Sequence, residues 1–182
     1  MDETPSDAAR KVLRVEAAAL TQLAENLPPD FDAVVSHLMT LSGRVIVSGM
    51  GKSGHVANKI AATLASTGTP SQAVHPAEAS HGDLGMITRN DAVVLISNSG
   101  ETRELADIIA YCTRFEIPII AITKRSDSTL AHAATYILKL PPAPEACAIG
   151  MAPTTSTTLA MALGDALAVA LMKQHGFDRE SY

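Results

Sequence analysis

Apolar residues recur along the chain with two different periods. From residue 8 to residue 27 they return at steps of three and four, as on one face of a helix, and a proline pair at 28–29 ends the pattern. Residues 31–41 repeat it over a shorter stretch before the break at Ser42-Gly43. We therefore predict that residues 1–42 form N-terminal helices that precede the rest of the domain.

Beyond this break, short runs rich in Val and Ile alternate with helical stretches. The runs cover 45–47, 73–74, 92–96, 118–122 and 136–140, and the helices cover 53–66, 102–115 and 154–173. Such alternation is typical of right-handed βαβ units, and runs that are apolar on both faces indicate strands covered by helices on each side. We predict one α/β domain, a three-layer αβα sandwich around a doubly wound parallel sheet, with its sheet core and final helix in residues 43–182.

Composition excludes several classes of function. The chain has 182 residues, and its 14 Lys and Arg against 19 Asp and Glu give a net charge of −5, which disfavours a nucleic-acid or anionic-membrane surface. Aromatic residues make up only 3%, too few for stacking platforms. The two cysteines form no CxxC pattern, the start is acidic, and no unbroken run of about 18 apolar residues occurs. A soluble cytoplasmic protein is expected.

Two loops rich in Gly and Ser each follow a predicted strand and open a helix. The first, SGMGKSGH at 48–55, formally matches G-x-G-x-x-G, but the acidic residue that a dinucleotide fold needs about 20 residues later is missing, because Glu78 lies beyond a proline. A tight turn explains this loop equally well. The second, SNSGET at 97–102, offers several hydroxyl and amide donors at a helix N-terminus, which suits a phosphate monoester. Together they predict a phosphate site at the carboxyl edge of the sheet.

Four motifs carry a resemblance to a known family: SGMGKSGHVANKIAATLASTGTPS, VHPAEASHGDLGMI, ISNSGET and EACAIGMAPTTSTT. In this order they resemble the sugar isomerase (SIS) family and, within it, the D-arabinose 5-phosphate isomerases. The resemblance implies a flavodoxin-like sandwich, a homotetramer without redox cofactor, and interconversion of D-arabinose 5-phosphate and D-ribulose 5-phosphate in octulosonate and lipopolysaccharide precursor synthesis. Members usually continue into a Ser-His-Pro-Gly-Gly segment with a catalytic histidine and into CBS domains, whereas this sequence ends at Tyr182.

Aldose-ketose isomerisation needs a base and a group that stabilises an enediolate. Lys52, at the tip of the first loop, suits a developing anion, although a solvated surface lysine is the alternative. Glu104 also fits ordinary compensation of a helix dipole. Glu145 lies in a proline-rich loop, where we expect no helix dipole and expect apolar neighbours to raise its pKa. The resemblance implies catalytic roles for all three, with Glu145 as the proton-shuttling base.

The remaining site residues open the sugar ring or hold the substrate. His81 suits ring opening, because a histidine near its reference pKa exchanges protons at neutral pH, although a structural role stays open. By resemblance, His75 is expected to contact a divalent metal such as zinc, as an inhibitor. The predicted substrate-binding residues are Gly51, Ser53, Gly68, Thr69, Ser97, Asn98, Ser99 and Thr102.

Two other functions stay open. A 3-hexulose 6-phosphate isomerase has about this length without CBS domains, but the HGDLG and EACAIG segments favour the arabinose branch. A non-catalytic SIS module that senses sugar phosphates would keep the phosphate loops without needing Lys52, His81 and Glu145 together. In each case the expected partners are a sugar phosphate and further copies of the chain, since the terminal helices are more apolar than a lone domain needs.

Overall fold

The computed structural model describes residues 3–178, and within them one sheet of five parallel strands forms the centre. The strands are β1 (Val45–Gly49), β2 (Ser71–Ala73), β3 (Ala92–Ile96), β4 (Ile119–Thr123) and β5 (Tyr136–Lys139). Their order is β2-β1-β3-β4-β5, the flavodoxin order, so the predicted doubly wound sheet is confirmed. The first two and last four residues of the predicted domain, Tyr182 included, lie outside the described residues.

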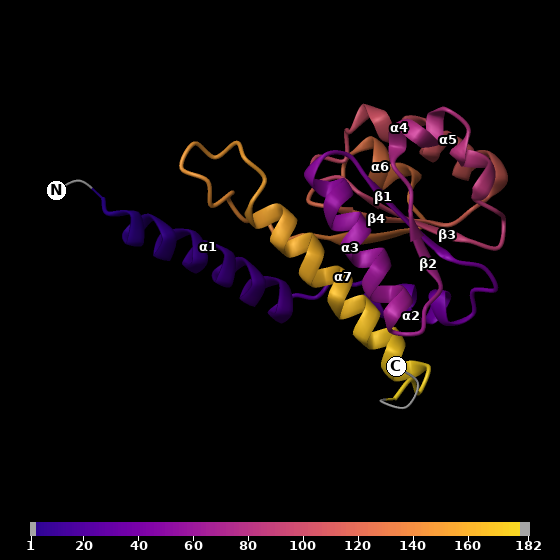
Figure 1. Ribbon diagram of the computed structural model, residues 1–182, viewed down its shortest axis with the longest axis horizontal. Helices are drawn as coiled ribbons and strands as arrows, with labels where there is room; N and C mark the ends of the chain where they lie inside the picture. Colours follow the sequence, from indigo (N-terminus) through magenta and orange to yellow (C-terminus); the bar gives the residue numbers. More distant parts are fainter. Residues whose placement is uncertain (1–2, 179–182) are drawn as a thin grey trace.

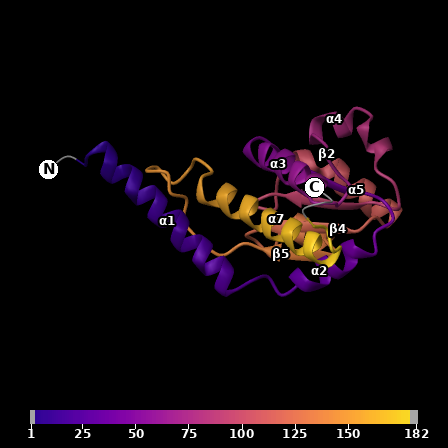
Figure 2. The same ribbon diagram turned by 60° about the horizontal axis from the view of Figure 1, so that its bottom comes forward.

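Helices cover both faces of the sheet (Figures 1 and 2). One face carries α1 (Pro5–Glu25), α2 (Phe31–Met39), α3 (Lys52–Ser66) and α7 (Thr155–Gln174). The other carries α4 (Pro76–Ser80), η1 (Asp83–Met86), η2 (Arg103–Leu105), α5 (Ala106–Phe115) and α6 (Thr129–Ala133). Successive strand residues point to opposite faces, so Val45 and Val47 join the first core while Ile46 joins the second. The sandwich therefore has the three predicted layers.

The two longest helices differ in how they are covered. Figure 1 shows α1 extending away from the sheet, and only Ala19 and Leu23 of this helix are fully buried. Helix α7 is 20 residues long and apolar enough to cross a membrane by length and composition. Its leucines at 159, 163, 167 and 171 are nevertheless buried in the first core. Helix α7 therefore packs against the sheet as part of the first core.

Several short elements escape the sequence pattern. No helix is predicted between β2 and β3 or between β4 and β5, yet the first segment contains α4 and η1 and the second contains α6. Strand β2 begins at Ser71, two residues before the predicted apolar run. One or two helical turns are too short to display a 3.6-residue period. Local caps hold them instead, as where Ser128 Oγ accepts a hydrogen bond from Ala131 N in α6.

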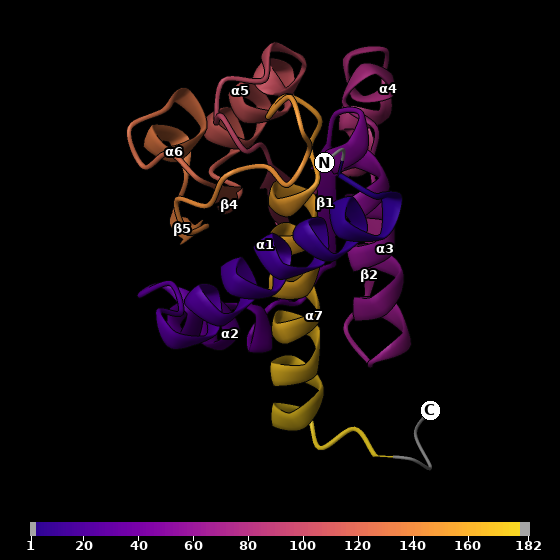
Figure 3. The same cartoon turned by 90° about the vertical axis from the view of Figure 1, so that its left-hand side faces the viewer.

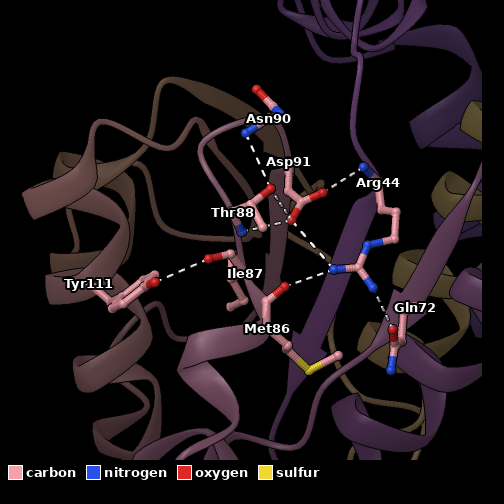
Figure 4. Close-up of polar contacts among 8 residues, drawn as sticks. All are labelled: Arg44, Gln72, Met86, Ile87, Thr88, Asn90, Asp91 and Tyr111. Atoms are coloured by element: carbon pink, nitrogen blue, oxygen red, sulfur yellow. Dashed lines mark hydrogen bonds and ion pairs between the residues drawn. The ribbon is translucent and has the colours of Figure 1, made fainter.

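A polar cluster closes the amino edge of the sheet (Figure 4). The buried Asp91 carboxylate accepts hydrogen bonds from Arg44 N at 2.6 Å and Thr88 N at 2.8 Å. The Arg44 guanidinium lies 3.6 Å from the same carboxylate and donates to Met86 O and to Gln72 Oε1. This cluster joins the segments that lead into β1 and β3, and thereby sets the register of the two strands whose other ends carry the loops.

Candidate active site

The two Gly- and Ser-rich loops meet because their strands are neighbours. Gly49 and Ile96, the last residues of β1 and β3, lie opposite one another in the sheet. Each loop leaves the carboxyl edge there and leads directly into a helix. Gly51 has φ +59°, and a Cβ at this position would meet nothing within 4 Å, so the backbone beside Lys52 is open to a ligand. The predicted juxtaposition of 48–55 and 97–102 is therefore present.

Hydroxyl groups organise the second loop from within. Ser97 is buried, its Oγ lies 2.7 Å from Thr102 Oγ1, and it accepts a hydrogen bond from Gly100 N. Ser99 Oγ accepts from Glu101 N at 3.2 Å. The side chains of Ser99 and Asn98 are exposed. The loop thus presents donor-bearing groups to solvent around a framework that the Ser97 hydroxyl holds in shape.

Helix α6 supports this loop from behind. Gly100 has φ +70°, and a Cβ there would come within 2.1 Å of Ser128 Oγ, so only glycine fits. The Glu101 carboxylate accepts hydrogen bonds from Thr129 N at 2.9 Å and Thr129 Oγ1 at 2.7 Å. These bonds, with smaller contributions from nearby charges, lower the pKa of Glu101. A cavity of about 210 Å³ lies between the loop, the start of α5 and α6.

Helices α3 and α7 bring a third segment to the same edge. They pack side by side and run in the same direction, since Lys59 pairs with Asp165 midway along them and Gly68, just after α3, lies against Phe177, just after α7 (Figure 3). Their N-termini therefore share the carboxyl edge. The loop before α7 also crosses this edge, because Lys124, which directly follows β4, donates from Nζ to Ala143 O at 3.2 Å. Glu145 and Lys52 thus lie at the same edge of one chain.

The Glu145 carboxylate caps the N-terminus of α7. Its Oε2 accepts hydrogen bonds from Thr154 N at 2.8 Å, Thr154 Oγ1 at 3.1 Å and Ser156 N at 3.2 Å. Burial by itself raises the pKa of this carboxyl, but the hydrogen bonds from Ser156 and Thr154 outweigh it and the net pKa is lowered. The expectation of a raised pKa and of no helix dipole at Glu145 is therefore wrong, because the chain folds back onto a helix start.

Glu145 also lines a cavity that is partly open to solvent. The cavity lies between the Glu145 loop and α1 and has a volume of about 320 Å³, in the range of small-molecule sites. Val12 and Val15 form the apolar side of this cavity, and Lys11 contributes a cation. The candidate base is thus partly shielded from water by the helix that extends from the sheet.

The other predicted catalytic residues lie exposed around the same edge. Lys52 is the first residue of α3, and Glu104 lies within η2. His81 follows α4, which packs against η2, so it is on the same side of the sheet as Glu104. The structure brings these residues to one edge, whereas their contacts with a substrate stay predictions.

His75 serves as the N-cap of α4. Its Nδ1 accepts a hydrogen bond from Ala77 N at 3.3 Å. Within residues 3–178, no three His, Cys, Asp or Glu side chains gather in a group that could hold a metal ion. The residues of one chain therefore do not by themselves fit a metal centre at His75, and its contact with a divalent metal stays a prediction.

Gly68 and Thr69 lie apart from the other predicted substrate-binding residues. They follow the C-terminus of α3 and precede β2, whose first residue Ser71 lies opposite Val45 at the amino edge. The ring of Phe177 lies against Gly68, and Thr69 is buried. The full length of α3 separates them from Ser53. One chain therefore does not bring these two residues to the site of the loops.

The sequence analysis missed Thr154 and Ser156, whose groups hold Glu145, and Thr129, which holds Glu101. For Thr154 and Ser156 the sequence carries one such signal. A Thr that directly precedes an apolar four-residue repeat is typical of a helix N-cap, where free backbone N–H groups attract an acidic side chain. The sequence pattern does not identify which acidic residue fills this position, because Glu145 comes from a loop.

Comparison with known proteins decides the family. The model of the SIS domain matches residues 38–170. The chain belongs to the SIS domain family. It is 48% identical, over 175 residues, to arabinose 5-phosphate isomerase KdsD of Escherichia coli strain K12, an alignment that covers 96% of this chain and 53% of that protein. The SIS chain thus spans about half the length of the curated relatives it matches.

Solved SIS structures share the fold. The structure of Escherichia coli CFT073 c3406 in complex with A5P is 36% identical to this chain, with a TM-score of 0.93 over 98% of this chain and 96% of that one. The sugar isomerase domain of the RpiR transcription factor from Sphaerobacter thermophilus is 21% identical, with a TM-score of 0.76 over 92% of this chain and 91% of that one. The second likeness concerns the fold alone.

Proposed function

We propose that the chain is an aldose-ketose isomerase domain that interconverts D-arabinose 5-phosphate and D-ribulose 5-phosphate. The observation that carries the proposal is the meeting, at one sheet edge, of two donor-rich loops with Lys52 and the capped Glu145 carboxylate. Relatives that are 48% identical and carry the name arabinose 5-phosphate isomerase support this choice of substrate. The role assigned is feeding octulosonate and lipopolysaccharide precursor synthesis in the cytoplasm.

The second loop is the proposed phosphate anchor. Ser97, Asn98, Ser99 and Thr102 supply hydroxyl and amide groups, and Ser53 and the Gly51 backbone belong to the loop that follows the neighbouring strand. The N-terminal end of α3 adds the positive end of a helix dipole. Since the phosphate is remote from the reacting carbons, its binding energy serves to position them.

Glu145 is the proposed proton shuttle. Its carboxylate removes the C2 proton of the open-chain aldose, the C2–H electron pair forms the C1–C2 double bond, and the carbonyl pair moves to O1. Return of the proton to C1 and transfer of the O2 hydroxyl proton to O1 complete the ketose. A carboxylate with a lowered pKa is ionised at neutral pH and ready to accept the proton.

Lys52 is assigned to stabilise the enediolate, because its ammonium stands at the start of α3 beside the open Gly51 backbone. Glu104 is the second carboxylate of the proposed catalytic set. His81, exposed on the same side as Glu104, is assigned to ring opening. C1 is reduced as C2 is oxidised, so the reaction is internally balanced and we assign it no redox cofactor. The proposed mechanism assigns no step to a metal ion.

A homo-oligomer, with a tetramer as the assigned state, accounts for Gly68 and Thr69. These residues lie at the edge opposite the loops, so the exposed Gly68, with the buried Thr69 behind it, would meet a substrate bound by the loops of another copy of the chain. The exposed Leu13 of α1 and Val169 of α7 offer apolar surface for such contacts. We assign no nucleic-acid or membrane partner.

The proposal is tested by incubating the chain in D₂O with D-arabinose 5-phosphate and, separately, with 3-hexulose 6-phosphate, and following C1 and C2 by NMR. Deuterium incorporation and conversion of the pentose alone support the proposal. Glu145→Gln should bind the pentose but turn over none of it, and full turnover by this variant would refute the assignment of the base.

The two alternatives are separate outcomes of the same experiment. Conversion of the hexulose alone would make the chain a 3-hexulose 6-phosphate isomerase. Binding of the pentose, observed by saturation transfer, without exchange or conversion would favour a sensing module, for which the RpiR likeness provides the fold. Either outcome overturns the proposed reaction.

A further inference from the structure

The Thr154 side chain links Glu145 to Ala146 in the loop that leads into α7. The Thr154 hydroxyl accepts a hydrogen bond from Ala146 N at 2.9 Å and lies 3.1 Å from Glu145 Oε2, to which it donates. Its only other acceptor among the described residues, Ala152 O, lies at 3.4 Å and is uncharged. Since a hydroxyl has one proton, the carboxylate is the favoured acceptor.

The backbone of the same residue adds a second contact to the same oxygen. Thr154 N donates to Glu145 Oε2 at 2.8 Å, and Ser156 N follows at 3.2 Å. Three hydrogen bonds therefore converge on Oε2, and the Ser156 side chain adds a further hydrogen bond to the same carboxyl group. This oxygen is the weaker proton acceptor of the two, and the carboxylate is held in one orientation against the N-terminus of α7.

We propose that Thr154 is the positioning residue of the isomerase, whose hydroxyl clamps Glu145 so that Oε1 receives the substrate proton. The inference rests on the proposed function, in which Glu145 is the base. Thr154 itself touches no reacting atom. It acts by holding one carboxylate oxygen and the adjacent Ala146 N–H together, which removes the freedom of the loop at the moment of proton transfer.

The pH dependence expected from the clamp has a definite sign. A hydrogen bond donated to the ionised carboxylate favours that form, so removing the Thr154 hydroxyl raises the pKa of Glu145. Other titratable groups face the same cavity, namely Glu3, Lys11 and Cys147. They are unchanged in a Thr154 variant, so a moved acidic limb reports on Glu145.

The test compares Thr154→Val with Thr154→Ser and with Thr157→Val. Thr157 is the matched control, because its hydroxyl donates to Thr154 O at 2.8 Å in the same turn of α7 but does not contact the carboxylate. Thr154→Val should lower kcat about 10- to 100-fold with little change in KM, and should move the acidic limb of the kcat profile to higher pH. Thr154→Ser should show the wild-type kcat and the wild-type acidic limb. Thr157→Val should leave the acidic limb at the wild-type pH. An unmoved acidic limb in Thr154→Val, or an equal shift in Thr157→Val, would overturn the proposal.

A second measurement separates this proposal from the proposed function. With glutamate labelled at ¹³Cδ, the Glu145 signal is identified by its absence in Glu145→Gln, and its titration needs no turnover. If the wild-type chain isomerises no sugar, the proposed function fails, yet a higher midpoint in Thr154→Val still supports the clamp. Coincident titrations of wild type and Thr154→Val would refute it.

Discussion

Ser97 Oγ and Thr102 Oγ1 lie 2.7 Å apart and hold the two ends of the SNSGET loop together. Thr102→Val removes this contact and one of the proposed phosphate donors while preserving the shape of the side chain. Because a hydrogen bond to a charged group is worth about 1.5–3 kcal/mol, kcat/KM should fall about 10- to 100-fold. Steady-state kinetics with D-arabinose 5-phosphate measures this. Thr113→Val, which breaks a hydroxyl contact on the exposed side of α5, should leave kcat/KM unchanged.

Lys52→Met tests the stabilisation of the enediolate. Removing one well-placed donor to a developing anion costs about 100-fold in kcat, and the buried core should be unaffected because Lys52 is exposed. Lys59→Met on the same helix loses only an exposed ion pair with Asp165, so it should retain full activity and nearly full stability. Equal kcat values for wild type and Lys52→Met would remove this lysine from the mechanism.

Asp91→Asn tests the polar cluster at the amino edge. The free energy of unfolding at pH 7, measured by urea denaturation, should fall by about 1.5–3 kcal/mol. Burial raises the pKa of Asp91, but the hydrogen bonds from Thr88 and Arg44 outweigh it and leave the pKa lowered. The folded state then binds fewer protons, so this stabilisation is present above the ordinary value near 3.8 and is lost as pH falls through the lowered pKa.

The contribution of Asp91 is separated from general acid unfolding by a control. Asp127 carries an almost fully exposed carboxylate, so Asp127→Asn should follow the wild-type stability at every pH. The difference in the free energy of unfolding between Asp91→Asn and wild type should instead become smaller as pH drops below about 4. If this difference in the free energy of unfolding stayed constant at strongly acidic pH, the ionised carboxylate would not be the stabilising form.

The two cysteines should differ in reactivity. Hydrogen bonds from the backbone N–H groups of Ala152, Ile149 and Met151 lower the pKa of the Cys147 thiol, whereas burial raises that of Cys112 to about 12. Ellman's reagent at pH 8 should therefore titrate one thiol in the native chain and two after denaturation. Cys147→Ser should abolish the native reaction and Cys112→Ser should not. Two rapid native thiols would contradict this assignment.

The layers and the meeting of the two loops were predictable from sequence, each on a different ground. Runs such as Ala92–Ile96 are apolar on both faces, which predicts the layers, whereas the flavodoxin order that makes β1 and β3 neighbours was implied by the resemblance to the SIS family. The environment of Glu145 was not predictable in this way. Its pKa depends on Thr154 and Ser156, which contact it only because a proline-rich loop folds back. Neither the period of apolar residues nor the composition predicts the course of this loop.

Distance along the chain does not predict where Gly68 and Thr69 lie relative to the loops. They follow Ser53 within one continuous motif, yet α3 carries them to the opposite edge of the sheet. The residues of a sequence motif are neighbours along the chain, whereas this site lies where several helices begin. Residues at the two ends of one long helix therefore do not meet within one chain. The short helices α4 and α6 were missed because their caps, rather than a repeat, define them.

The position of α7 late in the chain has a consequence for synthesis. The sheet residues Val45, Val47, Val94 and Ile120 belong to the core that α7 completes. While the ribosome is still making residues 155–174, all five strands have been made but one face of the sheet lacks its central helix. Nascent chains at this stage present an uncovered apolar surface and are candidates for chaperone binding, and stalling before α7 should favour aggregation.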